Sequence, residues 1–347
     1  NEVLSTRIIG RPGAGKTGLI LPIIKRLKQR KVKGLVWDAK GSLYASMFDP
    51  KTDRLFNVVD DRGFGWGLFN EVKTETDFDL LSFSLIPHRE HASDSARFFD
   101  GGARAVFSGG LRHLDLHGKR TNNNIWKFFQ MSPNSIHEAL LTTKGAEEGA
   151  KFLAPDERGS RQADTMATLL QYISGLKYMQ DMHGGFSTRS WLEDKKPGLL
   201  YITSFEDIEY TLRPLYSLLI DLIIKRLLSM PDDLEREVFF LLDEVASLNM
   251  LPALLKGLTK GRSKGGRIIL ATQDPFQLQR RYGEDGVHII ESSCGNRVTF
   301  SVSGKTAERE ADLNIGTAEI SSPVRNSAIS DEKNSSTNIA EHIFKDP

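Results

Sequence analysis

One segment near the N-terminus constrains the fold of this chain more than any other feature. Gly10-Arg11-Pro12-Gly13-Ala14-Gly15-Lys16-Thr17 fits the pattern G-x-x-x-x-G-K-[ST], follows the apolar run Arg7–Ile9 and precedes a helical pattern over Thr17–Gln29. Glycines here let backbone N–H groups turn inward around phosphate oxygens, and the start of the helix adds the positive end of its dipole. Lys16 can then reach β- and γ-phosphates, and the Thr17 hydroxyl can ligate Mg²⁺. The segment predicts a nucleotide-binding loop.

The remaining pattern predicts an α/β fold with a mainly parallel sheet. Helical patterns at Leu212–Leu228 and Leu251–Leu258 lie between short apolar runs, and such alternation indicates a parallel sheet. The runs are typical of strands buried on both faces. They are Arg7–Ile9, Leu35–Trp37, Leu199–Thr203, Val238–Leu242, Ile268–Ala271 and Val298–Val302.

The alternation stops over residues 73–191, where the apolar spacing is helical and no strand is evident. We therefore predict a discontinuous α/β nucleotide-binding domain over residues 1–72 and 192–347, with an all-α domain inserted at 73–191. After Glu310 the chain is rich in Ser, Asn and Ala and loses its periodicity, which predicts a loop or an extended tail.

The composition is that of a soluble globular protein, because 39% of the 347 residues are hydrophobic and 26% are charged. A disordered, collagen-like or disulfide-stapled chain is excluded, and the single cysteine, Cys294, suits a reducing compartment. The net charge of +1 does not indicate a nucleic-acid partner. Residues 256–281, however, hold seven basic residues and one acidic residue, and a second basic cluster spans Lys25–Lys33. Each is either a solvated face or a nucleic-acid patch.

No segment predicts a transmembrane helix or a signal peptide. The most apolar stretch, Pro214–Ile224, is too short to span a bilayer and contains Asp221. Residue 1 is Asn rather than Met, so we expect the sequence to be a fragment of a longer protein.

A pair of acids follows one predicted strand. Asp243 and Glu244 come directly after the run Val238–Leu242. Such a pair places one carboxylate beside a bound metal and a second near the γ-phosphate, where Asp243 would hold Mg²⁺ and Glu244 would orient and deprotonate the attacking water. The alternative is an ordinary strand-end cap. Downstream of a phosphate-binding loop, the pair favours hydrolysis over transfer to a small acceptor.

Two further residues suggest a motor. Gln273 follows the strand Ile268–Ala271, where a polar side chain could sense the γ-phosphate. Arg262 lies in a basic, glycine-rich segment at 260–267 and could reach the nucleotide of a neighbouring subunit as an arginine finger, although a surface-loop arginine is the alternative.

Other candidates are weaker. His113 and His117 have a spacing that could place both on a metal, but the pattern H-E-x-x-H is incomplete and no third ligand is evident. Trp126, Phe128 and Phe129 could stack on bases, but we expect them in a hydrophobic core. Cys294 is expected in or near the core.

Several segments occur in an order that resembles one family. After the loop at 10–17 come Asp38-Ala39-Lys40-Gly41, Phe186–Asp194 (FSTRSWLED), Leu242–Leu248 (LDEVASL), Leu258–Arg262 (LTKGR) and Ala271–Asp274 (ATQD). Together, over about residues 5–310, they resemble the cytosolic part of a type IV secretion coupling protein, of the TraD/TrwB family of conjugative DNA-transfer ATPases. The phosphate loop and the Asp-Glu pair are generic, whereas the SWLED and TKGR segments are specific to this family.

The resemblance implies a RecA-like domain with an inserted all-α domain. It also implies a hexamer at the inner-membrane base of a secretion channel, anchored by an N-terminal transmembrane segment. Such proteins couple a relaxase–DNA complex to the channel and hydrolyse ATP with Mg²⁺ to drive transport. By position, Lys16 and Thr17 match the family's phosphate and Mg²⁺ residues, and Asp243 and Glu244 match its metal and catalytic acids. Arg262 matches its proposed finger and Gln273 its motif glutamine.

We therefore expect an ATP-driven DNA motor of a type IV secretion system, which acts on single- or double-stranded DNA without sequence specificity. The whole protein would work at the cytoplasmic face of the bacterial inner membrane. Because this sequence contains no anchor, we expect a soluble fragment that can be monomeric.

Two other functions stay open. The chain could be a recruitment platform for protein cargo with ATP as an assembly switch, because residues 73–191 hold 14 basic and 14 acidic residues and so carry no basic excess. It could also be a ring DNA translocase outside secretion, which has the same chemistry. The Asp-Glu pair and the chain length disfavour a nucleoside-type kinase.

Overall fold

The computed structural model describes residues 4–90, 92–155, 160–180, 182 and 184–315. Its sheet has seven strands in the order β3-β4-β2-β5-β6-β1-β7, and every strand pair in it is parallel. The predicted parallel α/β fold is therefore confirmed. The strands are β1 (Thr6–Ile9), β2 (Lys33–Asp38), β3 (Arg54–Phe56), β4 (Gly198–Thr203), β5 (Val238–Asp243), β6 (Gly266–Thr272) and β7 (Asn296–Thr299).

The two edge strands differ from the sequence prediction. β3 was not predicted, because it has only three residues and begins at the exposed Arg54. The predicted strand Val298–Val302 is wrong in its bounds: β7 begins at Asn296 and ends at Thr299. Its residues alternate between half-buried and exposed because successive side chains point to opposite faces of the sheet. None of the four is fully buried, since β7 pairs only with β1.

Helices cover both faces of the sheet and separate two hydrophobic clusters. Successive strand residues point to opposite faces, so Val36 packs with Ile20 and Ile24 of α1 (Lys16–Gln29), whereas Leu35 and Trp37 belong to the other cluster. The first face is completed by α2 (Ser42–Met47). On the second face lie α10 (Glu209–Ser229) and α11 (Pro252–Lys260), and α12 (Pro275–Ser293) follows β6.

The described residues between 73 and 191 contain helices joined by turns and loops and no strand, as predicted. The helices are α3 (Thr76–Leu85), α4 (Asp94–Leu116), α5 (Asn122–Phe129), α6 (Pro133–Leu141), α7 (Glu147–Phe152), α8 (Ser160–Ile173) and α9 (Thr188–Glu193). Trp126, Phe128 and Phe129 lie in the core or pack against it, which confirms their expected place. Short 3₁₀ turns complete the chain: Leu68–Glu71, Ser174–Tyr178, Glu206–Ile208, Val245–Ser247 and Gly261–Lys264.

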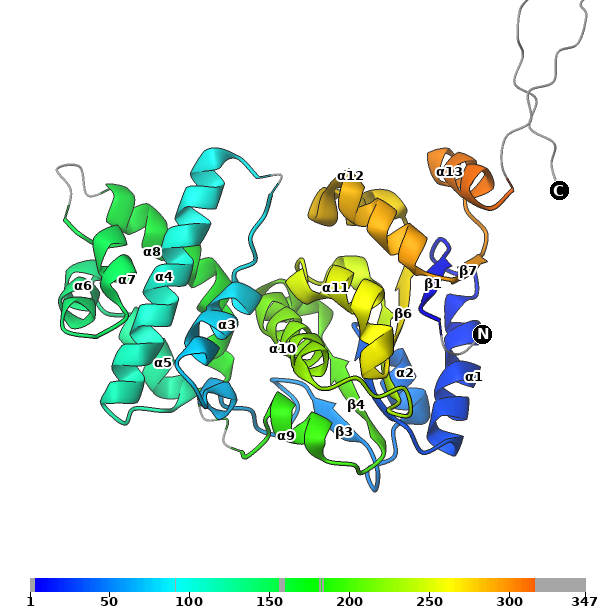
Figure 1. The fold of residues 1–347 in the computed structure, drawn as a ribbon, viewed down its shortest axis with the longest axis horizontal. Helices are drawn as coiled ribbons and strands as arrows, with labels where there is room; N and C mark the ends of the chain where they lie inside the picture. The colour runs from blue at the N-terminus through cyan, green and yellow to red at the C-terminus, as the bar shows by residue number, and fades with distance from the viewer. Residues whose placement is uncertain (1–3, 91, 156–159, 181, 183, 316–347) are drawn as a thin grey trace, which may run out of the picture. The chain divides into compact units, whose positions relative to one another are not determined.

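Helix α10 joins the insertion to the sheet. It lies between the insertion helices and the strands (Figure 1), and its residues from Leu212 to Leu227 are nearly all buried. This position explains why the most apolar stretch of the sequence falls here. Arg226 of α10 forms an ion pair with the buried Asp77 of α3 at 2.6 Å. The insertion and the sheet therefore share one packed core.

Residues from Val302 onward form a separate unit, of which residues 302–315 are described. They contain α13 (Lys305–Asn314). The predicted loop after Glu310 is therefore wrong as far as Asn314, because Ala311 and Leu313 extend a run of good helix formers. The rest of the predicted tail, residues 316–347, lies outside the described residues. No helix in the described part of the chain is long and apolar enough to span a membrane.

Candidate active site

The loop at residues 10–15 joins β1 to α1 and exposes backbone donors. Gly13 and Gly15 have φ angles of 76° and 101°, a left-handed conformation that side chains other than glycine rarely adopt. Gly15 begins the helix and no side chain caps it, so the first N–H groups of α1 are available to an anion. A Cβ atom on Gly10 would lie 2.7 Å from the Cβ of Phe300, so only glycine fits there.

Lys16 lies at the first position of α1 and folds over this loop. Its Nζ donates a hydrogen bond to the carbonyl of Gly10 and lies 3.4 Å from the carbonyl of Arg11. Thr17 follows it and is exposed. The predicted loop, which includes Pro12 and Ala14, therefore lies at the carboxyl end of β1 with the ammonium group of Lys16 against its first two carbonyls.

Glu244 follows β5 and faces the end of β6. Its φ of 62° is unusual for a residue other than glycine. Its Oε1 accepts a hydrogen bond from the Thr272 hydroxyl at 3.4 Å, and its Oε2 is buried without a hydrogen-bond partner. Burial raises the pKa of Glu244, while a hydrogen bond from Gln273 and the charge of Lys16 act in the opposite direction. Glu244, Gln273 and Lys16 are thus brought together.

Asp243 is the last residue of β5 and lies beside the carboxylate of Asp38, for which the sequence motifs predict no role. It stands in register with Asp38, the last residue of β2. Burial and then the charge of Asp38 raise the pKa of Asp243, and the charges of Lys16 and Lys40 lower it. The carboxyl ends of β2 and β5 therefore place two acids side by side, and the charges of Lys16 and Lys40 act on Asp243 there.

Asp38 itself is fully buried. Its Oδ2 accepts a hydrogen bond from the backbone N–H of Tyr44 at 2.8 Å, but its Oδ1 has no hydrogen-bond partner. Burial raises the pKa of Asp38, although backbone N–H groups such as that of Tyr44 oppose this rise. The signal for this residue was an acid directly after an apolar strand, the same signal that marked Asp243.

Arg262 does not join this group. It lies in the 3₁₀ turn Gly261–Lys264, which precedes β6, whereas Gln273 follows the last residue of β6. The seven residues of β6 separate the two positions by roughly 20 Å at about 3.3 Å a residue. Arg262 is thus at the opposite edge of the sheet from Lys16, and its role as a finger toward another subunit stays a prediction.

The two histidines and the cysteine singled out from the sequence lie outside the phosphate-loop site. The rings of His113 in α4 and His117, which directly follows this helix, lie 4.3 Å apart, and Nδ1 of His113 is 2.9 Å from the Thr143 hydroxyl. No cluster of three His, Cys, Asp or Glu side chains that could hold a metal occurs among the residues described. Cys294 is buried, as expected.

The parallel sheet, the glycine loop with Lys16 and the acids at the ends of neighbouring strands define a P-loop nucleotide-binding protein of the RecA-like α/β class. Comparison with known proteins narrows this class. A family model for the type IV secretion-system coupling protein DNA-binding domain matches residues 1–342. The chain belongs to this family of coupling proteins.

Its relatives include the coupling protein TraD of Escherichia coli strain K12, which is 28% identical over 316 residues. That match covers 89% of this chain and 43% of TraD, so the chain spans less than half of this relative. Similar structures include the plasmid coupling protein TrwB with the ATP analogue ADPNP (TM-score 0.76, 26% identity, 85% of this chain and 70% of that chain). TrwB with ADP and Mg²⁺ matches with a TM-score of 0.75 and 26% identity, over 84% of this chain and 68% of that chain.

Proposed function

We propose that this chain is the ATP-hydrolysing motor part of a coupling protein that drives DNA toward a type IV secretion channel during conjugation. The observation that carries the proposal is the meeting of Lys16, Asp243, Glu244 and Gln273 at one edge of the sheet. Family membership and the similarity to nucleotide-bound TrwB support ATP and Mg²⁺ as the ligands.

The residues at this edge fit a divalent cation. Asp38 is buried, its neighbour Asp243 is half-buried, and the Oδ1 atom of Asp38 has no hydrogen-bond partner. Mg²⁺ prefers one or two carboxylates together with phosphate oxygens. Asp243 and the Thr17 hydroxyl would hold the ion, with Asp38 as a nearby acceptor for its water. The bound ion would neutralise charge on the phosphates.

Each predicted residue has one task in this proposal. The backbone N–H groups of residues 10–17 cradle the phosphates, and Lys16 leaves the carbonyl of Gly10 to contact the β- and γ-phosphates. Glu244 orients the attacking water and accepts its proton, and its raised pKa brings it closer to the value that suits a general base. Gln273 contacts Glu244, and in this proposal it responds to the γ-phosphate.

We extend the proposal to the assembly in which the chain would work. Arg262 would complete the site of a neighbouring subunit in a homo-hexamer, since it lies away from its own phosphate loop. The DNA would arrive with relaxase proteins and leave through channel components. The whole protein would act at the cytoplasmic face of the bacterial inner membrane. Membership of the coupling-protein family supports these steps.

ATP hydrolysis by the chain, with and without DNA at low salt, tests the proposal. We expect DNA to stimulate hydrolysis, and Lys16→Ala to abolish it because the phosphates lose their main cation. Exposed Lys25 lies further along the same helix, so Lys25→Ala is the control for a general effect on α1. Equal hydrolysis by the wild type and by Lys16→Ala would contradict the proposed site, and hydrolysis indifferent to DNA would contradict the motor.

A further inference from the structure

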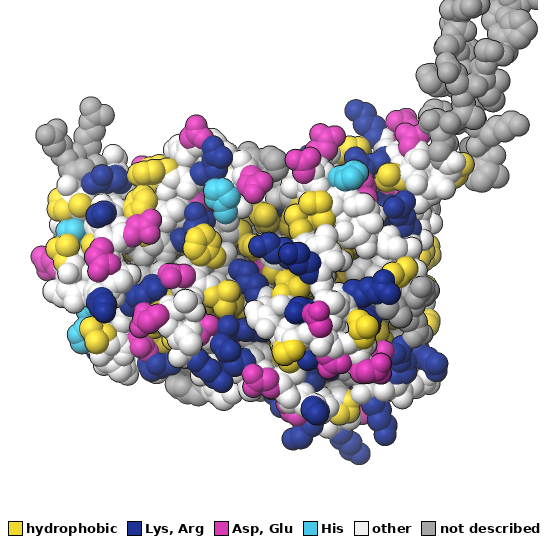
Figure 2. All heavy atoms as spheres, viewed as in Figure 1, with side chains coloured by type: hydrophobic (Ala, Val, Ile, Leu, Met, Phe, Trp, Pro, Cys, Tyr) yellow, Lys and Arg dark blue, Asp and Glu magenta, His cyan; other side chains and the backbone are white. Residues whose placement is uncertain are grey.

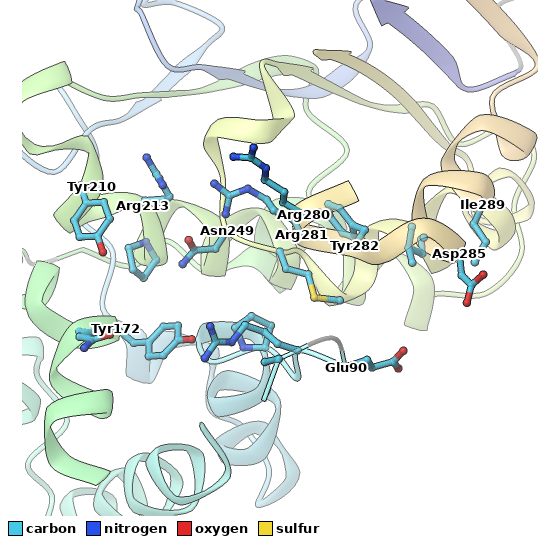
Figure 3. Close-up of a pocket in the computed structure, with 18 residues that line it drawn as sticks. Glu90, Tyr172, Tyr210, Arg213, Asn249, Arg280, Arg281, Tyr282, Asp285 and Ile289 are labelled. Atoms are coloured by element: carbon cyan, nitrogen blue, oxygen red, sulfur yellow. The ribbon is translucent and has the colours of Figure 1, made fainter. Parts of the chain in front are cut away.

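A groove between the helical insertion and α10–α12 is lined by none of the residues proposed to bind or hydrolyse the nucleotide. Its volume is about 650 Å³, and residues from the segment after α3, from α8, α10 and α12 line it. Figure 3 shows α10 and α12 residues on one wall and Tyr172 of α8 on the other. On the surface, Figure 2 shows Lys and Arg side chains gathered in the region where the insertion meets α10 and α11.

The two ends of the groove differ in charge. One end, which we call the arginine end, is formed by Arg213, Arg280 and Arg281. Tyr210 lies beside it. Figure 3 shows Glu90 and Asp285 toward the other end. An anion is therefore attracted to the arginine end of the groove.

The cations of the arginine end are only partly neutralised. Arg213 forms an ion pair with Glu209 at 3.2 Å, but its Nε is buried without a hydrogen-bond partner. No carboxylate within ion-pair distance is found for Arg280 or Arg281 in the described part of the chain. Burial and then the charge of Arg213 lower the pKa of Arg281, and the charge of Glu209 opposes them only in part, so two guanidinium groups repel each other here. A bound anion would remove this repulsion.

Aromatic rings accompany these cations. Tyr210 is 82% exposed, and the guanidinium of Arg213 lies 5.6 Å from the centroid of its ring. Tyr172 lies on the facing wall. Cations beside exposed aromatic rings are typical of grooves for single-stranded nucleic acid, where bases stack and phosphates meet arginine. An acidic peptide would use the cations but would gain little from Tyr210.

The size of the groove favours one strand over a duplex. Its volume falls within the range of small-molecule pockets, so one or two nucleotides can enter it. A double helix could touch only the rim.

The same groove contacts the turn that holds Glu244. Arg281 donates from Nε to the carbonyl of Ala246 at 3.0 Å, two residues after Glu244. Within this turn the Ser247 hydroxyl donates to the carbonyl of Glu244 at 2.8 Å. One arginine therefore lines the groove and fixes the backbone beside the proposed base.

We propose that the arginine end binds a single-stranded segment of nucleic acid through Arg213, Arg280, Arg281 and Tyr210. Arg281 then transmits the presence of the strand to Glu244, a step that rests on the proposed function. Arg281 is a positioning residue in this scheme. Its Nε keeps the bond to Ala246 while its outer nitrogens contact a phosphate, so the strand stiffens the turn that aims Glu244.

Binding to a fluorescent oligothymidylate tests the site in the full chain. We expect Arg280→Ala to weaken binding several-fold and to reduce the slope of log affinity against log salt by about 0.7 for the lost phosphate contact. Tyr210→Ala should weaken binding by about fivefold or more through lost stacking. Arg26→Ala, an exposed arginine in the other basic cluster, is the control and should bind as the wild type does.

Three outcomes would overturn the site. The first is a loss of binding in Arg26→Ala as large as in Arg280→Ala, which would mean diffuse attraction. The second is wild-type binding by Arg280→Ala and Tyr210→Ala. The third is a polyglutamate peptide that binds in place of the oligonucleotide and is lost in Arg280→Ala, which would make the groove a peptide site.

Arg281→Lys tests the transmission. We expect this variant to lose the DNA stimulation of ATP turnover even at saturating oligonucleotide, as a fall in the DNA-stimulated kcat with the KM for ATP retained. A purely structural arginine would instead lower the rates with and without DNA in proportion. Retained stimulation would overturn the role of Arg281. If the wild type hydrolyses no ATP, the proposed function fails; if it shows DNA-stimulated hydrolysis but Arg280→Ala and Tyr210→Ala bind normally, only the groove fails.

Discussion

Glu244 combines an unusual backbone conformation with a buried carboxylate. A left-handed φ of 62° costs a residue other than glycine about 1–2 kcal/mol, and the hydrogen bond from Ser247 to its carbonyl helps to hold it. The conformation turns the side chain toward Thr272 and Gln273 rather than along the strand. Strain of this kind is common where a reacting group must be aimed.

The raised pKa of Glu244 predicts the pH dependence of hydrolysis. A general base works only when deprotonated, so kcat should fall as the pH drops through a value above that of a free glutamate, about 4.3. Gln273→Ala removes a hydrogen bond that lowers this pKa, so the acid limb should move to higher pH. A pH profile of kcat at saturating ATP measures both effects. A wild-type rate that stays constant down to pH 4.3 would contradict the assignment.

The buried carboxylate of Asp38 should lower the free energy of unfolding of the nucleotide-free chain. Burial raises the pKa of Asp38, so the folded state holds its proton more tightly than the unfolded state does. The free energy of unfolding therefore falls as the pH rises from the pKa of the unfolded state through the higher pKa of the folded state. Asp38→Asn removes a buried charge beside Asp243 and should raise the free energy of unfolding at neutral pH by roughly 0.5–2 kcal/mol. It should also reduce the rise in Tm caused by an ATP analogue with Mg²⁺.

Thermal unfolding with and without that ligand checks this trade-off. The exposed Asp61 gives the control, Asp61→Asn, which should change neither quantity. Loss of stability in nucleotide-free Asp38→Asn would show that its hydrogen bond to Tyr44 outweighs the buried charge.

At the scale of elements, α4 shows how glycine permits close helix packing. A Cβ on Gly110 would lie 2.4 Å from the Phe129 ring, whereas on Gly101 it would meet only Arg104 at 3.8 Å. Gly110→Ala should therefore lower the free energy of unfolding by about 1–3 kcal/mol through overpacking. Gly101→Ala should raise it by up to about 1 kcal/mol because alanine is the better helix former. Urea unfolding measures the change in the free energy of unfolding for each variant. Equal changes in the two variants would contradict the packing of α4.

The elements predicted from the sequence were those with strong local signals. Central strands such as β5 are buried on both faces and so read as continuous apolar runs. α2 was missed because six residues show little periodicity, and α12 because Gly283, with a φ of 70°, interrupts its pattern at a kink. The glycine loop and Asp243–Glu244 were found because each follows a strand directly. Asp38 was missed because its partnership with Asp243 depends on β2 lying next to β5, and strand order is a tertiary property.

At the scale of the whole molecule, the distance between Arg262 and its own phosphate loop predicts sites shared between subunits. Lys16→Ala lacks a working loop but keeps its finger, and Arg262→Ala has the reverse defect. Each variant alone should hydrolyse little ATP, since an arginine finger contributes about 10³–10⁵ in rate. Mixing the two should restore activity, because some interfaces then join an intact loop to an intact Arg262. A mixture no more active than its parts would contradict a finger that acts between subunits.

The central claim is that Glu244 is the base of an ATP-hydrolysing site, and Glu244→Gln tests it most directly. Steady-state hydrolysis should be measured beside the binding of a fluorescent ATP analogue with Mg²⁺, with the exposed Glu235→Gln as the control. We predict that Glu244→Gln binds the analogue about as well as the wild type does but hydrolyses ATP at least about 100-fold more slowly, because no group accepts the proton of water. Hydrolysis at the wild-type rate would contradict the account.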